Sequence, residues 1–342
     1  MLRSLPSIAL AALLATVGLL DAQSRRAGTK AWRKLYVVNT AGDDVTVVDV
    51  ATRKVLGRIE VGPHPHGIAA PASQDLLLVT IEGGKGELVW IDPATDKVIR
   101  RMPTGAAPNQ LAVTPDGKFA YVPVAGGNYL VVDVAQATIV DKIFTGGQPH
   151  NTVCSQDGRH MYLAPLGGKK TVTIVDVATR KVIGAIPFSD SVRPIALTRD
   201  EKKFFAQVDG LVGIELADVD ARKMIHRVPA EVPAELKKTN SRSHGLSVRP
   251  GDKEIWDCDV ERKLVHVYDI TAEKPKQVAS IPIGGTVYWL TFDPEGKYAY
   301  VSALSKSEVA VVDAAAREVV ARIPVGKAPK RLLVVDVPRE KK

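Results

Sequence analysis

The chain contains 342 residues, of which 45% are hydrophobic, 5% aromatic and 25% charged, and its formal net charge is +8. These values are ordinary for a water-soluble protein, and the positive charge favours anionic partners. No predicted strand alternates aromatic and basic residues as a platform for single-stranded nucleic acid requires, so we do not expect nucleic-acid binding.

The N-terminal residues 1–22 have the pattern of a signal peptide. A basic start at Arg3 precedes 13 apolar residues, Ile8 to Leu20, and the small residue Ala22 suits cleavage. The apolar stretch is shorter than the ~20 residues that cross a bilayer as a helix. We therefore predict a cleaved signal, a periplasmic or secreted mature chain without a transmembrane span, and a basic segment at 23–34; an uncleaved anchor is the alternative.

From residue 35 onward the chain repeats one unit. The stretch Val45–Val55 reads VTVVDVATRKV, and residues 172–182 read VTIVDVATRKV. Self-similarity of this kind indicates a repeat architecture and takes precedence over local predictions. The aspartate of the phrase occurs in seven copies, at Asp49, Asp92, Asp133, Asp176, Asp218, Asp269 and Asp313.

Each copy contains four strand-length segments rich in Val, Ile, Tyr and Thr, separated by Gly, Asp or Pro turns. Four strands in a unit of roughly 42 residues are typical of a propeller blade. We predict an all-β, seven-bladed β-propeller with four antiparallel strands per blade, formed as a single domain by residues 35–337 and followed by a charged tail at 338–342. The C-terminal strand Arg331–Val337 should complete the blade that Leu35–Val61 begins, so that the two ends of the chain share one blade and close the ring.

The phrase Tyr36-Val37-Val38-Asn39, with looser copies at Tyr121 and Tyr300, resembles the motif of the YVTN-type seven-bladed β-propeller repeat proteins. The resemblance covers residues 35–337 and implies the propeller fold. It also implies similarity to binding proteins, to surface proteins and to the haem-binding propeller domain of bacterial nitrite reductases. We expect the protein to be a monomer.

Two departures from the repeat are informative. The segment Val228–Ser243 adds about nine residues between the outer strand of one blade and the channel strand of the next. Such a loop opens on the face where propellers bind ligands, so it is either a plain surface loop or a lid over that face.

The only cysteines, Cys154 and Cys258, fall on different blades, and we predict that both are free.

The second departure lies at the start of each channel-facing strand, where the copies disagree. Seven equivalent positions in a closed ring point at roughly the same place, so they form a candidate channel mouth. These positions carry His66, Asn109, His150, Arg193, His244, Tyr288 and Lys330.

Three of these residues, His66, His150 and His244, come from the first, third and fifth units and divide the ring nearly into thirds. Neutral imidazoles converging on an axis are suitable ligands for a transition metal. The alternative is that each histidine caps backbone groups beside the preceding turn. Arg193 and Lys330 would repel a cation and attract an anion, which favours an anionic ligand at the same mouth.

Carboxylates follow the second strand of several units near the same face. Glu82 and Asp209 are placed either to orient His66 and His244 as hydrogen-bond acceptors or to pair with Arg193 and Lys330. No nucleophile with an adjacent base can be recognised, so the sequence predicts no hydrolase triad.

The leading hypothesis is therefore a binding or scaffold protein whose channel mouth receives a small anionic ligand or a protein partner, and which is not an enzyme. A redox protein that binds a transition metal or haem is the first alternative, although the chain has no CxxCH phrase. A propeller lactonase is the second alternative and rests on the fold alone.

Overall fold

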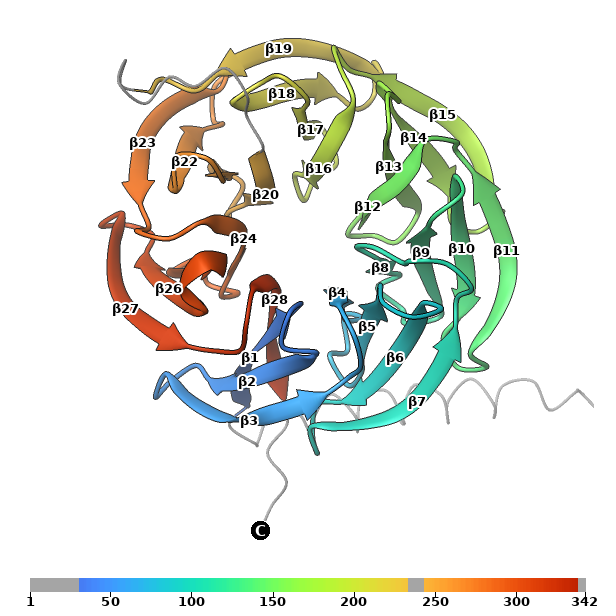
Figure 1. Cartoon of the computed structure of the whole chain (residues 1–342). Helices are drawn as coiled ribbons and strands as arrows, with labels where there is room; N and C mark the ends of the chain where they lie inside the picture. Colours follow the sequence, from blue (N-terminus) through green and yellow to red (C-terminus); the bar gives the residue numbers. More distant parts are fainter. Residues whose placement is uncertain (1–30, 233–242, 338–342) are drawn as a thin grey trace, which may run out of the picture.

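The computed structural model describes residues 31–232 and 243–337. These residues form seven four-stranded antiparallel sheets that radiate from a central axis (Figure 1). The predicted all-β, seven-bladed propeller is thereby confirmed. The predicted signal peptide at 1–22, most of the insertion and the tail at 338–342 lie outside the described residues.

Each blade consists of four strands that follow one another from the axis outward. The closing blade contains β28 (Pro329–Val337), β1 (Trp32–Asn39), β2 (Asp44–Asp49) and β3 (Lys54–Glu60), and the next contains β4 (Pro65–Ala69), β5 (Leu77–Ile81), β6 (Glu87–Asp92) and β7 (Lys97–Pro103). The third contains β8 (Ala112–Val113), β9 (Phe119–Val124), β10 (Asn128–Asp133) and β11 (Thr138–Phe144), and the fourth contains β12 (Gln148–Cys154), β13 (His160–Leu166), β14 (Thr171–Asp176) and β15 (Lys181–Pro187). The last three contain β16 (Val192–Leu197), β17 (Lys203–Val208), β18 (Gly213–Asp218) and β19 (Lys223–Pro229); β20 (Ser243–Val248), β21 (Glu254–Asp259), β22 (Leu264–Asp269) and β23 (Lys276–Pro282); and β24 (Val287–Phe292), β25 (Tyr298–Ala303), β26 (Glu308–Asp313) and β27 (Glu318–Pro324).

The recurring aspartate explains why the phrase VVDVATRK is repeated. Asp49 Oδ1 accepts the backbone N–H of Thr52 at 2.7 Å, and Asp176 does the same for Thr179 at 2.7 Å. The turn that the aspartate stabilises joins the third strand of a blade to the fourth. Arg53, at φ 60°, takes the left-handed conformation that this turn requires.

Both faces of the inner strands are buried, as the period of two in a β-strand dictates. In β1, Tyr36 and Val38 pack into a cluster with Val79 of the next blade. The alternate residue Val37 packs into a different cluster, which includes Val311 of the preceding blade. Each fully buried Val or Leu contributes about 1.5–3 kcal/mol, so the ring is stable only when every blade has two neighbours.

The ends of the chain meet in the closing blade, as predicted. Strand β1 pairs antiparallel with both β2 and β28, and Arg33 Nε lies 2.6 Å from Asp336 Oδ1 across the second pair. Because β1 begins at Trp32, the last residues of the expected basic segment belong to the blade.

Helical structure is sparse in the described residues. Within 31–232 and 243–337 the only helix is the 3₁₀ turn η2 (Leu304–Lys306), and no helix there is long and apolar enough to cross a membrane. Cys154 and Cys258 are both free, in agreement with the sequence prediction.

Candidate functional site

The channel mouth is lined by the starts of the innermost strands, which surround the central opening in Figure 1. Six of the seven predicted positions lie on these strands, and Asn109 precedes the short strand β8. The structure brings several of them together: the His150 and His244 rings stack at 5.7 Å, and the His244 and Tyr288 rings lie 4.6 Å apart. Lys330 Nζ lies 5.2 Å from the centre of the Tyr288 ring. Side chains from four blades thus meet at the axis.

His66 is held by the carboxylate that follows the neighbouring strand. Its Nδ1 lies 3.1 Å from Glu82 Oε2. Burial, reinforced by the positive charges of Lys330 and Arg331, lowers the pKa of His66 to about 4, and the hydrogen bond to His66 lowers the pKa of Glu82. The imidazole is therefore neutral beside an ionised carboxylate, and Nδ1–H donates to Glu82. Its Nε2 is buried and has no hydrogen-bond partner among the described residues.

Asp209 and Asn109 have more local roles. Asp209 accepts a hydrogen bond from Arg193 Nε in the same blade and forms an ion pair with it. Asn109 Oδ1 accepts the N–H of Gln110 at 2.9 Å, and its carbonyl accepts the Thr80 hydroxyl at 2.9 Å. The alternative in which Asp209 pairs with Arg193 is thus the one found, and the side-chain oxygen of Asn109 stabilises its own turn.

Arg331 is the residue that the repeat comparison missed. Its side chain is only 1% exposed, and its guanidinium carbon lies 3.4 Å from the centre of the Trp289 ring, which belongs to the adjacent blade. Within the described chain, Nε and Nη1 of Arg331 have no hydrogen-bond partner. Burial lowers the pKa of Arg331 to about 9, so it stays charged at neutral pH.

A signal for Arg331 was present in the sequence. The residue after each mouth position forms a second ring, and it carries a charge only in the closing blade. The second ring consists of Gly67, Gln110, Asn151, Pro194, Gly245, Trp289 and Arg331.

The charges at the mouth do not cancel. Burial followed by the nearby positive charges, Arg331 among them, holds the pKa of both His150 and His244 well below the ordinary value, so these rings are neutral. Burial also lowers the pKa of Lys330. Among the described residues, the mouth therefore combines the cations Arg193, Lys330 and Arg331 with the carboxylates Glu82 and Asp209, a net charge of one positive unit.

Comparison with known protein families identifies the family of this propeller. The family model described as YNCE-like beta-propeller matches residues 6–339. The chain belongs to this family. No curated protein matches its sequence significantly.

Solved structures similar to this YNCE-like propeller include the periplasmic gluconolactonase PpgL of Pseudomonas aeruginosa, at 17% identity and a TM-score of 0.75 over 90% of this chain and 100% of that one. The dihydro-heme d1 dehydrogenase NirN in complex with DHE is 16% identical, with a TM-score of 0.63 over 88% and 74% of the two chains. A protein from Lactobacillus plantarum is 13% identical, with a TM-score of 0.77 over 90% and 100%. At these identities the likeness establishes the fold alone.

The three histidines of this YNCE-like propeller do not gather as a metal centre does. Across the described part of the chain, no group of three or more His, Cys, Asp or Glu side chains is arranged to hold a metal ion. The His150 and His244 rings lie 13° from parallel, whereas ligands of one ion direct the lone pairs in their ring planes at a common point. Arg331 and Lys330 further disfavour a cation. Metal or haem binding stays a prediction, and absorption spectroscopy with elemental analysis of the purified protein tests it.

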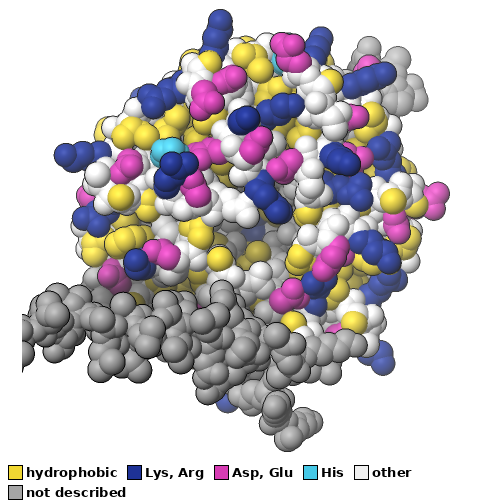
Figure 2. Space-filling model, turned by 180° about the vertical axis from the view of Figure 1, so that it is seen from behind, with side chains coloured by type: hydrophobic (Ala, Val, Ile, Leu, Met, Phe, Trp, Pro, Cys, Tyr) yellow, Lys and Arg dark blue, Asp and Glu magenta, His cyan; other side chains and the backbone are white. Residues whose placement is uncertain are grey.

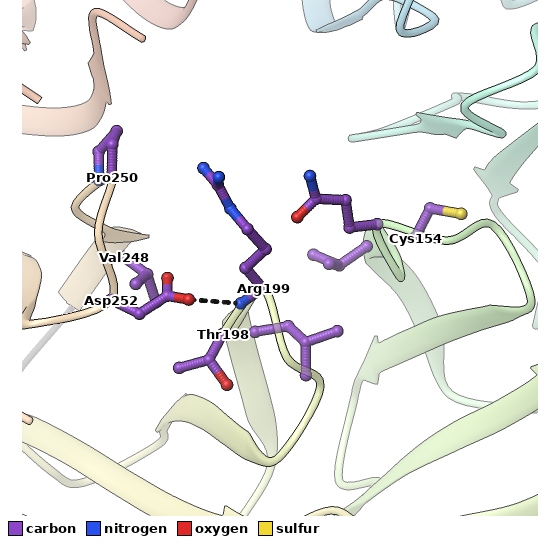
Figure 3. Close-up of a pocket in the computed structure, with 9 residues that line it drawn as sticks. Cys154, Thr198, Arg199, Val248, Pro250 and Asp252 are labelled. Atoms are coloured by element: carbon purple, nitrogen blue, oxygen red, sulfur yellow. Dashed lines mark hydrogen bonds between the residues drawn. The ribbon is translucent and has the colours of Figure 1, made fainter. Parts of the chain in front are cut away.

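The opposite end of the channel holds a cavity of about 230 Å³ (Figure 3). Cys154 and Arg199 line this cavity, and the backbone N–H of Arg199 donates to Asp252 Oδ2 at 3.0 Å. Burial raises the pKa of Cys154 to about 12, so the thiol is protonated and a poor nucleophile. Figure 2 shows the face opposite to that of Figure 1, where basic and acidic side chains are interspersed without a continuous basic stripe.

Proposed function

We propose that this YNCE-like propeller is a binding protein that takes a small carboxylate at the channel mouth. The observation that carries the proposal is the buried guanidinium of Arg331, whose Nε and Nη1 find no acceptor among the described residues. A buried charge without a counter-charge is strongly unfavourable, whereas a bound carboxylate would supply both the charge and two acceptors.

The surroundings of Arg331 suit an anion. Lys330, from the same strand, lies at the mouth with its ammonium over the Tyr288 ring. Trp289, from the adjacent blade, packs against the guanidinium of Arg331. Arg193 is already paired with Asp209 and adds little further attraction. Two cations from β28 are therefore the main binding groups, and the neutral imidazoles line the remaining wall.

A periplasmic or secreted location accompanies this proposal. It is supported by the apolar N-terminal stretch Ile8 to Leu20 and by the fold shared with a periplasmic gluconolactonase. The carboxylate of an Asp or Glu side chain on a partner protein has the same chemistry, but a burial as deep as that of Arg331 favours a small molecule.

Calorimetric titration of the full chain with acetate and propionate tests the proposal. We expect binding that weakens at least tenfold in Arg331→Met, because a charge-assisted hydrogen bond contributes about 1.5–3 kcal/mol. Arg199→Met, at the opposite end of the channel, is the matched control and should bind normally. Equal affinity of the two variants, or no binding of either acid by the wild type, would overturn the proposal.

Lactone hydrolysis is a second candidate, and the Glu82–His66 pair favours it. A neutral imidazole oriented by a carboxylate through Nδ1 has its Nε2 free to accept a proton from water. Turnover of sugar lactones that disappears in His66→Ala would replace the binding function by this one.

A further inference from the structure

We infer that the ligand of the channel mouth is a hydroxy-monocarboxylate, whose carboxylate binds Arg331 and Lys330 while its hydroxyl donates a hydrogen bond to His66 Nε2. The inference rests on the proposed anion site and goes beyond it by specifying the second polar group and the charge of the ligand. It is carried by the hydrogen bonds of His66 and by the balance of charges around it.

His66 offers the ligand an acceptor. An ionised Glu82 has no proton to give, so the 3.1 Å contact requires that His66 Nδ1 carries the hydrogen. A second proton on the same ring would face the positive charges of Lys330 and Arg331 and is unfavourable. Nε2 therefore presents a lone pair, and His66 is only 4% exposed. A buried acceptor of this kind requires a donor, which a simple carboxylate lacks.

The net charge of the mouth distinguishes between the hydrogen-bond donors that a ligand could carry. With neutral histidines, the part of the mouth that the structure describes carries a single uncompensated positive charge, because three cations, Arg193, Lys330 and Arg331, face the carboxylates Glu82 and Asp209. One carboxylate neutralises this charge, and a doubly charged phosphate monoester would exceed it. An ammonium donor would add a cation beside Lys330 and Arg331, which disfavours amino acids. A neutral hydroxyl on a monocarboxylate satisfies both conditions.

Three nearly isosteric acids separate the contribution of the ligand's hydroxyl group from that of its charge. Propionate, lactate and alanine differ only in carrying hydrogen, hydroxyl or ammonium at the carbon next to the carboxylate. Titration of the wild-type chain at pH 7.5 should show lactate binding about fivefold to tenfold more tightly than propionate, as one additional hydrogen bond provides. Alanine should bind more weakly than propionate.

Variants at His66 assign the difference to its ring. His66→Phe keeps a ring of similar size but has no acceptor, so the preference should disappear and the variant should bind lactate and propionate equally. His64→Asn is the control, because His64 is exposed and its φ of 52° is one that asparagine tolerates. It should keep the preference for lactate.

The outcomes separate the two proposals. If propionate and lactate bind equally to the wild type, or if alanine equals lactate, the hydroxy-acid inference is wrong while the carboxylate site stands. If neither propionate nor lactate binds, the carboxylate site itself is wrong. Because the ligand series is decisive on the wild type, the test does not depend on the folding of His66→Phe.

Discussion

Replacing Arg331 by methionine should stabilise the ligand-free protein. Folding carries this guanidinium into a site where it is 1% exposed, and burial lowers its pKa from the ordinary value of an arginine to about 9. At about 1.36 kcal/mol per pKa unit, this fall corresponds to a cost of roughly 4–5 kcal/mol at neutral pH. The contact with Trp289 offsets about 2 kcal/mol of this cost. Arg331→Met, which keeps the bulk without the charge, should therefore raise the free energy of unfolding by about 2–3 kcal/mol.

The pH dependence provides an independent check. Above about pH 9 and below the ordinary pKa of an arginine, the folded chain binds fewer protons at Arg331 than the unfolded chain, so wild-type stability rises with pH through this window. The advantage of Arg331→Met should then be greatest below pH 9 and shrink above it. The comparison needs urea unfolding of both proteins at pH 7.5 and 10, in buffer without carboxylates.

Propionate should narrow this difference in stability, because a wild type that binds it at least tenfold more tightly than the variant gains at least about 1.4 kcal/mol more from it. Arg199→Met serves as the control, since its side chain is exposed at the other end of the channel and should change stability by less than about 0.5 kcal/mol. A destabilisation of Arg331→Met by about 2 kcal/mol or more in carboxylate-free buffer would refute the reasoning, because it would mean that the protein itself compensates the charge.

Three further predictions concern titrating groups. Burial lowers the pKa of His66 to about 4, so between about pH 6.5 and 4 the unfolded chain binds more protons than the folded chain and stability falls as the pH drops. Urea unfolding at pH 7 and 4.5 should show that the wild type loses about 2–3 kcal/mol more of its free energy of unfolding than His66→Phe does. Glu82→Gln removes the charge that raises the pKa of His66, so NMR titration should find that pKa lower still, and an unchanged value would contradict the pair. Asp257, a buried residue of β21, has a pKa that burial raises to about 7, so stability is lost as the pH rises from about 4 to 7. Asp257→Asn should therefore be more favourable at pH 8 than at pH 4 by about 2–4 kcal/mol in urea unfolding, and equal effects at both pH values would contradict this prediction.

The fold could be predicted from the sequence because each blade repeats the same local chemistry. The aspartate of each copy fixes the turn before the outer strand, as Asp49 and Asp176 show, and the alternating apolar residues of β1 require a neighbour on both faces. The closing blade followed from the same rule, since a lone strand at the C-terminus can bury its faces only by joining the N-terminal blade.

The candidate site could be predicted only in outline. Alignment of the copies found His66, His244 and Lys330, because those positions differ from copy to copy. It could not show that Arg331 is buried against Trp289, since that contact joins two blades and depends on the packing between them. It also left open the partner of Asp209, because strand pairing within the blade, and not the ring position, brings Arg193 to it.

The strand that closes the propeller also carries both cations of the proposed site. Strand β28 pairs with β1, and Asp336 near its end binds Arg33, so the strand is held in place by contacts remote from the mouth. At its other end Lys330 and Arg331 reach Tyr288 and Trp289 of the preceding blade. An anion bound to Arg331 would thus remove the electrostatic cost of closing the ring at this joint. Ligand binding and ring closure would then be coupled through one strand, which gives a physical reason for Arg331 at a position where the other copies carry Gly, Gln, Asn, Pro or Trp.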